Sequence, residues 1–118
     1  MTDGDRSFEL YDLRVEIVAV EPGLEDVCNH HLGDHFTVSG ENVSIPAGRT
    51  FSMYALAAVL PLLPAKQRVT DVNDWMRSDD LVMCPDPQCK AVMRITRTGV
   101  RTFLRAAVTA TPPPDDAE

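Results

Sequence analysis

The chain has 118 residues, of which 44% are hydrophobic and 25% charged, and its formal net charge is −7. This composition is typical of one globular domain and excludes a wholly disordered chain, a collagen-like repeat and a disulfide scaffold. The negative charge is concentrated in residues 1–12 and 112–118, and the rest of the chain has no basic excess, so nucleic acid is not expected as a partner.

The first half of the chain predicts three strands and a helix. Alternating apolar and polar side chains predict a strand over residues 11–20, and shorter strands are expected over 34–38 and 43–45. The segment 52–60 combines helix formers with a hydroxyl at its start, which predicts a short helix capped by Ser52. Because this helix is apolar on nearly every side, we expect it to be buried.

Two prolines follow the predicted helix. Pro61 and Pro64 are expected to end it, because proline lacks the backbone N–H that a helix interior needs. A polar connection over 66–80 comes next and contains the only tryptophan, Trp75. A connection of this length in a small domain is usually functional or internally packed. A short strand is then expected over 81–84.

The last predicted element is a β-hairpin. The segments 91–97 and 100–108 flank Thr98-Gly99, a dipeptide suited to a two-residue turn. One face of this hairpin would carry the core residues Ala91, Met93, Ile95, Val100, Leu104 and Ala106. The other face would carry Arg94, Arg101, Phe103 and Arg105. Such a row of arginines fits either a solvated sheet face or a pocket for a carboxylate or phosphate group.

Together these elements predict an α+β fold: a small antiparallel β-sheet, open or rolled toward a barrel, with one short buried helix. We expect a flexible N-terminus over residues 1–10 and a single domain over 11–110. Residues 111–118 are rich in proline and acids, which predicts a disordered tail.

The cysteines carry the clearest chemical signal. The chain opens without a basic-then-apolar leader, and its longest apolar run, residues 53–65, is too short to span a bilayer. We therefore expect a cytoplasmic protein without a membrane partner, in which the three cysteines are free thiols or metal ligands. Cys28, one of the nearby histidines, Cys84 and Cys89 would make a Cys₃His set suited to zinc. Buried, inert packing cysteines are the alternative.

Several short patterns occur in a fixed order within residues 11–97. They are Cys28 followed by Gly33-Asp34-His35-Phe36, Pro46-Ala47-Gly48, the helix start at residues 52–56, the prolines of 60–64, Asn73-Asp74-Trp75, and Cys84-Pro85-Asp86-Pro87. In this combination the chain resembles an uncharacterised family of small bacterial proteins, often found near biosynthetic or redox genes.

The resemblance implies up to three recurring cysteines, which correspond to Cys28, position 52 and Cys84. This chain has Ser52 where a cysteine is usual in the family, and Cys89 is an addition. A cysteine at a helix N-terminus would have a lowered pKa, because the unpaired N–H groups there favour the thiolate. Serine keeps the helix cap and loses the thiolate chemistry. The resemblance implies that these three positions surround one pocket.

Our first hypothesis is a small cysteine-dependent enzyme, or an enzyme-like accessory protein, of a bacterial specialised pathway that is biosynthetic or redox. Cys84 would be the reactive thiol or primary ligand with Cys28 and Cys89 as its partners, and Ser52 would belong to the same catalytic set. Asp86 would orient the loop or move a proton, and His30 or His31 would be the general base. Arg94, with Arg101 and Trp75, would hold an anionic small-molecule substrate whose identity is open.

The alternative hypothesis is a non-catalytic metal-binding module. In it Cys28, Cys84, Cys89 and His31 would bind zinc or another transition-metal ion and tie the loops to the sheet. A third hypothesis is an interaction domain whose cysteines are inert. The sequence leaves the oligomeric state open.

Overall fold

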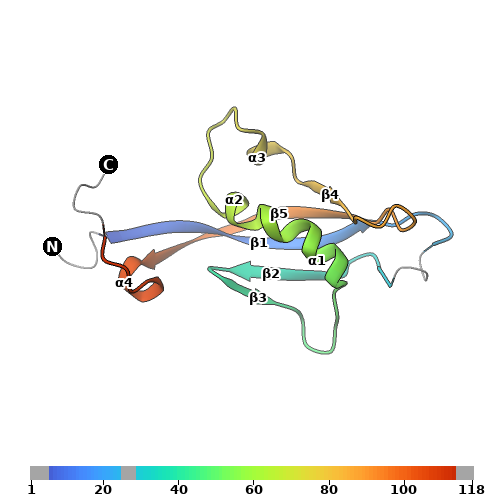
Figure 1. Cartoon of the computed structure of the whole chain (residues 1–118), viewed down its shortest axis with the longest axis horizontal. Helices are drawn as coiled ribbons and strands as arrows, with labels where there is room; N and C mark the ends of the chain where they lie inside the picture. Colours follow the sequence, from blue (N-terminus) through green and yellow to red (C-terminus); the bar gives the residue numbers. More distant parts are fainter. Residues whose placement is uncertain (1–5, 25–28, 114–118) are drawn as a thin grey trace.

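The computed structural model describes residues 6–24 and 29–113, and its central feature is a five-stranded antiparallel sheet (Figure 1). The strands are β1 (Ser7–Ala19), β2 (His35–Ser39), β3 (Asn42–Ser44), β4 (Leu81–Met83) and β5 (Val92–Leu104). Their order is β3-β2-β1-β5-β4, with β3 and β4 at the two edges. The α+β prediction is confirmed, and the sheet is open rather than closed into a barrel.

The main core lies between the middle of this sheet and a helical segment. Leu13, Val15 and Ile17 alternate along β1 and are fully buried. Val15 lies opposite Phe36 of β2 on one side and Ile95 of β5 on the other, so three strands supply one apolar face. This alternation with a period of two made β1 predictable, although the strand begins at Ser7, ahead of the predicted start at residue 11.

The helical segment consists of α1 (Met53–Val59), the 3₁₀ turn η2 (Leu60–Leu62) and α2 (Leu63–Gln67). Its core-facing residues are Ala55, Val59 and Leu63. The outward face is apolar too, since Met53 is 69% exposed, so the helix covers the sheet with one face and is not buried on all sides as expected. The prolines do not end the helical path. They occupy first-turn positions of η2 and α2, where the missing N–H costs nothing.

The predicted hairpin at Thr98-Gly99 is wrong. β5 runs without reversal through these residues and pairs with β1 along its whole length. The register shifts by one residue opposite Asp12 and Leu13, which makes Thr98 the extra residue of a β-bulge. The core face therefore stops at Ile95, because Val100 and Leu104 are 56% and 42% exposed.

The predicted arginine row is also not formed as expected. Residues that would have continued the second hairpin strand form a helical turn, α4 (Arg105–Val108), so Arg105 and Ala106 are not strand residues.

Within the described part of the chain, no helix has the length and apolar character that crossing a membrane requires.

The molecule is elongated, with dimensions of 59 × 36 × 21 Å. β2 pairs with β1 only from Leu13 onward, and β4 pairs with β5 only near its start. The remaining parts, residues 7–12 of β1 and 99–104 of β5, project as a two-stranded ribbon that ends in α4 (Figure 1). We call this ribbon and α4 the arm. The loop that carries Cys84 and Cys89 lies at the opposite end of the molecule (Figure 1).

Candidate metal centre

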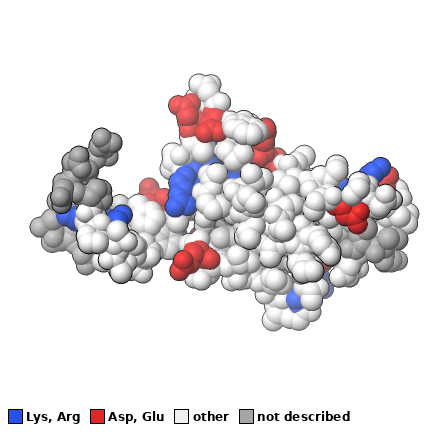
Figure 2. Space-filling model, in the orientation of Figure 1, with Lys and Arg blue, Asp and Glu red and all other residues white. Residues whose placement is uncertain are grey.

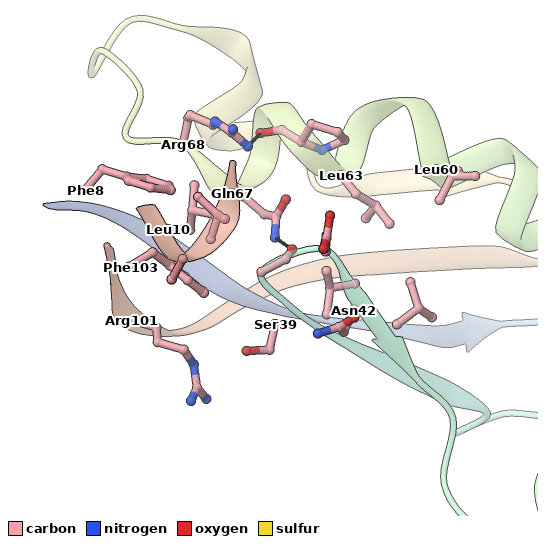
Figure 3. A pocket seen from close by; sticks show the side chains of 17 residues that line it. Phe8, Leu10, Ser39, Asn42, Leu60, Leu63, Gln67, Arg68, Arg101 and Phe103 are labelled. Atoms are coloured by element: carbon pink, nitrogen blue, oxygen red, sulfur yellow. Dashed lines mark hydrogen bonds between the residues drawn. The ribbon is translucent and has the colours of Figure 1, made fainter. Parts of the chain in front are cut away.

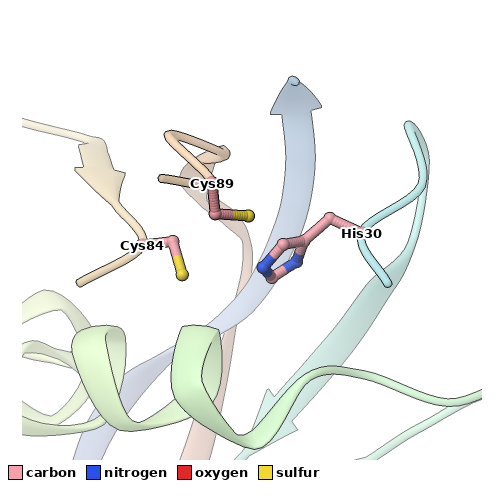
Figure 4. A group of neighbouring side chains, drawn as sticks. All are labelled: His30, Cys84 and Cys89. Atoms are coloured by element: carbon pink, nitrogen blue, oxygen red, sulfur yellow. The ribbon is translucent and has the colours of Figure 1, made fainter. Parts of the chain in front are cut away.

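Three side chains from two loops converge at the end of the molecule opposite the arm. His30 comes from the loop before β2, and Cys84 and Cys89 come from the loop between β4 and β5 (Figure 4). The nitrogen and sulfur atoms that these residues offer to a metal all lie within 4.8 Å of one another. Each residue is no more than 4% exposed. We call this set the His30 cluster.

The loop between the two cysteines is fixed by its own hydrogen bonds. The backbone N–H of Cys84 donates to the carbonyl of Ala91 at 2.8 Å and closes the base of the loop. At its tip the carboxylate of Asp86 accepts from the N–H of Gln88 at 2.9 Å, and the Asp86 carbonyl accepts from the N–H of Cys89 at 3.0 Å. Prolines on both sides of Asp86 restrict φ. These local bonds shape the loop from which both sulfurs point toward His30 (Figure 4).

The second loop is attached to the end of β1. The N–H of Gly33 donates to the carbonyl of Ile17, and the N–H of Ile17 donates to the carbonyl of Asp34. Gly33 has a φ of +90°, which side chains rarely adopt. The N–H of His31 donates to the Asp34 carboxylate at 3.2 Å and closes the turn. This arrangement fixes the direction in which His30 leaves the backbone.

The sequence placed His31 in the metal site, whereas the structure brings His30 to the cysteines. The His31 side chain is 58% exposed and its Nδ1 lies 3.4 Å from the Asp34 carboxylate. His35 is also engaged elsewhere, with its Nδ1 3.1 Å from the carbonyl oxygen of Gly33. His31 is therefore not part of the cluster as the described residues define it.

Backbone strain is concentrated beside the cluster. Among the described residues, the only non-glycine residues with positive φ are Asn29 at 56° and Lys90 at 58°. Asn29 directly precedes His30, and Lys90 directly follows Cys89. A left-handed residue with a side chain costs roughly 1–2 kcal/mol. Strain of this kind typically persists at functional sites, where the surrounding structure enforces it.

The electrostatic environment favours neutral forms of the ligand side chains. Burial lowers the pKa of His30 below its ordinary value, so the imidazole is neutral and available as a ligand at neutral pH. Burial also raises the pKa of the Cys84 thiol, and a hydrogen bond from the Asp86 backbone N–H opposes this only in part. A bound metal ion reverses the effect, because its charge stabilises the thiolate.

The remaining predicted site residues are placed differently. Ser52 caps α1, its hydroxyl accepting from the N–H of Ala55 at 3.4 Å. Cys28 lies outside the described residues. Asp86 shapes the loop between Cys84 and Cys89, which we call the cysteine loop, because its carboxylate accepts a hydrogen bond from the N–H of Gln88. The proposed approach of Ser52 to a cysteine sulfur stays a prediction.

The three predicted substrate-binding residues do not belong to the His30 cluster. The Nε of Arg94 lies 3.6 Å from the carboxylate of Asp80, and Arg101 pairs with Asp12 at 2.9 Å. Trp75 is 68% exposed on a short helix, α3 (Trp75–Ser78), within the polar connection over residues 66–80. Their role in binding an anionic substrate stays a prediction.

Sequence reasoning missed Asn29 and Lys90, the two strained residues beside the ligands. No local pattern marks a lysine for positive φ, although the asparagine, which tolerates that region, offered a weak signal.

No protein-family model, no curated protein and no solved structure matches the chain. The interpretation of the cluster therefore depends on its geometry and chemistry.

Proposed function

We propose that the protein binds a zinc ion through the imidazole of His30 and the thiolates of Cys84 and Cys89, and that it acts as a non-catalytic metal-binding module. The observation that carries the proposal is the convergence of three buried soft or borderline ligands from two loops far apart in sequence. Ligand atoms around tetrahedral zinc lie about 3.5–3.8 Å apart. Small side-chain rotations bring atoms that are already within 4.8 Å of one another to that spacing.

The metal would fasten a part of the molecule that has little apolar packing of its own. Cys84, Cys89 and Ala91 form a small buried group that is separate from the main core and touches the half-buried Val20. A zinc ion there ties the β4–β5 loop to the loop before β2. Cys28 remains the predicted fourth ligand, which would complete the tetrahedral Cys₃His set of a closed structural site.

Two observations favour this function over a cysteine nucleophile. Reactive cysteines are partly exposed and have a lowered pKa. Cys84 is only 4% exposed, and its pKa is raised by burial. A thiol with these properties is a poor nucleophile until a metal or another cation stabilises its thiolate.

The proposal is tested by elemental analysis of protein purified without chelator. We expect about one zinc per chain, lost or strongly reduced in His30→Ala, Cys84→Ser and Cys89→Ser. His31→Ala is the matched control, because the neighbouring imidazole is exposed and should leave the zinc content unchanged. Replacing zinc with Co²⁺ should give a thiolate-to-metal absorption band that disappears in the cysteine variants.

The same preparation distinguishes the competing hypotheses. Metal-free protein that binds neither ion, with cysteines that react only after unfolding, would leave an interaction domain with inert thiols. A metal-free protein whose Cys84 is modified rapidly in the native state would favour the cysteine-dependent enzyme. Cys28→Ser should reduce zinc affinity without abolishing binding if it is the fourth ligand.

A further inference from the structure

The cysteine loop turns only its two thiols inward. Cys84 and Cys89 are buried, whereas residues 85–88 between them are exposed, and so is Lys90. Both cysteines are free thiols. The pairing of β4 with β5 closes only the base of the loop. The bonds that the two sulfurs form therefore decide how the rest of the loop is held.

The two sulfurs lie close to each other as well as to His30. The side chain of Cys84 forms a hydrogen bond with that of Cys89, and their sulfurs are within 4.8 Å of each other. A disulfide needs an S–S separation of about 2 Å. One staggered step about χ1 moves a cysteine sulfur by roughly 3 Å, so rotation of the side chains covers the difference. The two thiols thus have a second bonding option besides a metal ion.

We propose that a small hydroperoxide oxidises Cys84 and Cys89 to an intramolecular disulfide, and that this modification releases the metal ion. The inference rests on the proposed function, since it concerns the control of the same zinc site. The disulfide removes two ligands in one step, because neither sulfur is a thiolate any longer. At most His30 and the predicted ligand Cys28 remain, whereas a closed structural zinc site has four ligands.

The chemistry is a two-electron oxidation of two thiolates. One thiolate attacks the terminal oxygen of the hydroperoxide, the O–O bond breaks, and the sulfur becomes a sulfenic acid while hydroxide or alkoxide leaves and takes a proton from water. The second thiolate then attacks the sulfenic sulfur, so that the S–S bond forms as the S–O bond breaks and hydroxide leaves. The two sulfurs lose two electrons and the peroxide gains them. The thiolate is the reactive form, and the zinc ion of the proposed site keeps both sulfurs in it.

The cluster is approached through the polar loop end of the molecule. Figure 2 shows acidic and basic side chains at this end, and the exposed residues of this loop region include Asp86 and Lys90. A large apolar cleft of about 850 Å³ lies instead where the arm meets the body of the molecule (Figure 3), and no cysteine or histidine lines it. An apolar peroxide held in that cleft would not reach the thiols. The site therefore fits a small polar oxidant such as hydrogen peroxide.

The disulfide and the metal ion hold the two loops differently. A zinc ion bonded to His30 joins the cysteine loop to the loop before β2, whereas a disulfide joins two residues of the cysteine loop to each other. Oxidation thus keeps the cysteine loop closed and releases the loop of His30. The N–H of Asp34 donates to the carbonyl of His31 at 3.0 Å within that second loop, so its exchange rate reports the release.

Titration of the zinc-loaded protein with hydrogen peroxide tests the inference. We expect one disulfide for each zinc ion released, seen as the loss of two hydrogen atoms from the mass of the reduced chain and as free zinc in a colorimetric assay. Peptide mapping should place the bond between Cys84 and Cys89. Exposed methionines such as Met53 gain an oxygen atom, which the mass distinguishes. Dithiothreitol should restore both thiols and zinc binding.

Hydrogen exchange measures the structural consequence. In the oxidised protein the amide of Asp34 should exchange at least about tenfold faster than in the zinc-loaded protein, whereas the amides of Cys84 and Cys89 should keep their protection. Faster exchange in the cysteine loop itself would contradict a disulfide that keeps this loop closed.

Matched variants separate the disulfide from the zinc site. Cys28→Ser removes the third thiol and should still form the disulfide, whereas Cys84→Ser and Cys89→Ser should not. His30→Ala should lose zinc and yet form the disulfide at alkaline pH, where the thiols ionise without a metal ion. His31→Ala is the control, because that imidazole is exposed, and it should release zinc as the wild type does.

Zinc that stays bound while peroxide oxidises Met53 would overturn the inference and leave the proposed function standing. Zinc release with Cys28 in the disulfide, or with cysteines oxidised singly, would also overturn it. Protein that binds no zinc would refute the proposed function and the release step together, and the mapping at alkaline pH would then decide on the disulfide alone.

Discussion

Lys66 shows how one buried cation organises a long connection. Its side chain is almost fully buried, and its Nζ donates to the carbonyls of Met76, at 2.6 Å, and Asp79. Arg97 acts in the same region, with its Nε donating to the Lys66 carbonyl and its guanidinium stacked 4.3 Å from the centre of the Tyr11 ring. Desolvation lowers the pKa of Lys66, so the hydrogen bonds have to offset a burial cost.

We predict that Lys66→Met lowers the free energy of unfolding by about 1–3 kcal/mol, because two carbonyls of the connection lose their donor while the apolar stem is kept. Urea denaturation followed by circular dichroism measures this change. Arg49→Met is the control at an exposed position and should be nearly neutral. Equal stability of the two variants would mean that water replaces the ammonium without cost.

The Asp12–Arg101 pair predicts a pH dependence. The Arg101 guanidinium beside Asp12 lowers the pKa of that carboxyl in the folded protein. The pair therefore contributes stability above the unfolded-state pKa, and this contribution is lost as the pH falls through the lower folded-state pKa. Arg101→Ala should be slightly less stable than the wild type at neutral pH and should match it in acid below that pKa. Paired thermal unfolding curves over an acid titration would show the two midpoints converging, and a constant gap would refute the assignment.

At the scale of elements, Gly40 offers a matched comparison. It joins β2 to β3 with a φ of +59°, and a Cβ there would lie 3.1 Å from Cε1 of Phe103 on the arm. Gly48 also has positive φ, but a Cβ there would meet nothing within 4 Å. We predict that Gly40→Ala destabilises the protein more than Gly48→Ala, since both substitutions strain the backbone by roughly 1–2 kcal/mol and only the first also displaces Phe103. Urea unfolding of the two variants tests this, and equal losses would show that the arm does not pack on this turn.

Elements with a local signature were predictable from the sequence. The alternation of Leu13, Val15 and Ile17 placed β1, and helix formers after Ser52 placed α1 with its cap. The error came at Thr98-Gly99, where the local turn signal was outweighed by pairing with the 13-residue β1. That pairing is a long-range contact and leaves no trace in the neighbouring residues.

In the candidate site, Cys84 and Cys89 were predictable from the sequence, whereas the choice of histidine was not. The paired prolines around Asp86 indicated a loop that holds two sulfurs on one side, which agrees with the structure. Choosing between His30 and His31 depended on the left-handed backbone of Asn29 and on the Asp34 contact that draws His31 away. Adjacent residues of one type differ only in the direction that the backbone gives them, so composition and spacing could not separate them.

At the scale of the whole molecule, the main core and the His30 cluster are separate. The ten buried residues of the main core come from β1, β2, β5, α1 and α2, and none of them is a proposed zinc ligand. The small group of Cys84, Cys89 and Ala91 is connected to that core through the half-buried Val20. Small metal domains that lack an independent core unfold when the metal is removed. In this protein the main core contains none of the proposed ligands.

We therefore predict that removing zinc loosens one end of the molecule and leaves the sheet folded, provided that the proposed site binds zinc. In chelator the far-UV circular dichroism should stay unchanged. The amides of Cys84 and Cys89, which bond within the cysteine loop, should exchange at least about tenfold faster, whereas amides in the core part of β1 and β5 keep their rates. Adding zinc back should restore protection, and the double variant Cys84→Ser, Cys89→Ser should exchange equally with and without the ion. Loss of the whole sheet signal on chelation would show instead that the metal holds the entire fold, because the main core would then be too weak to persist without it.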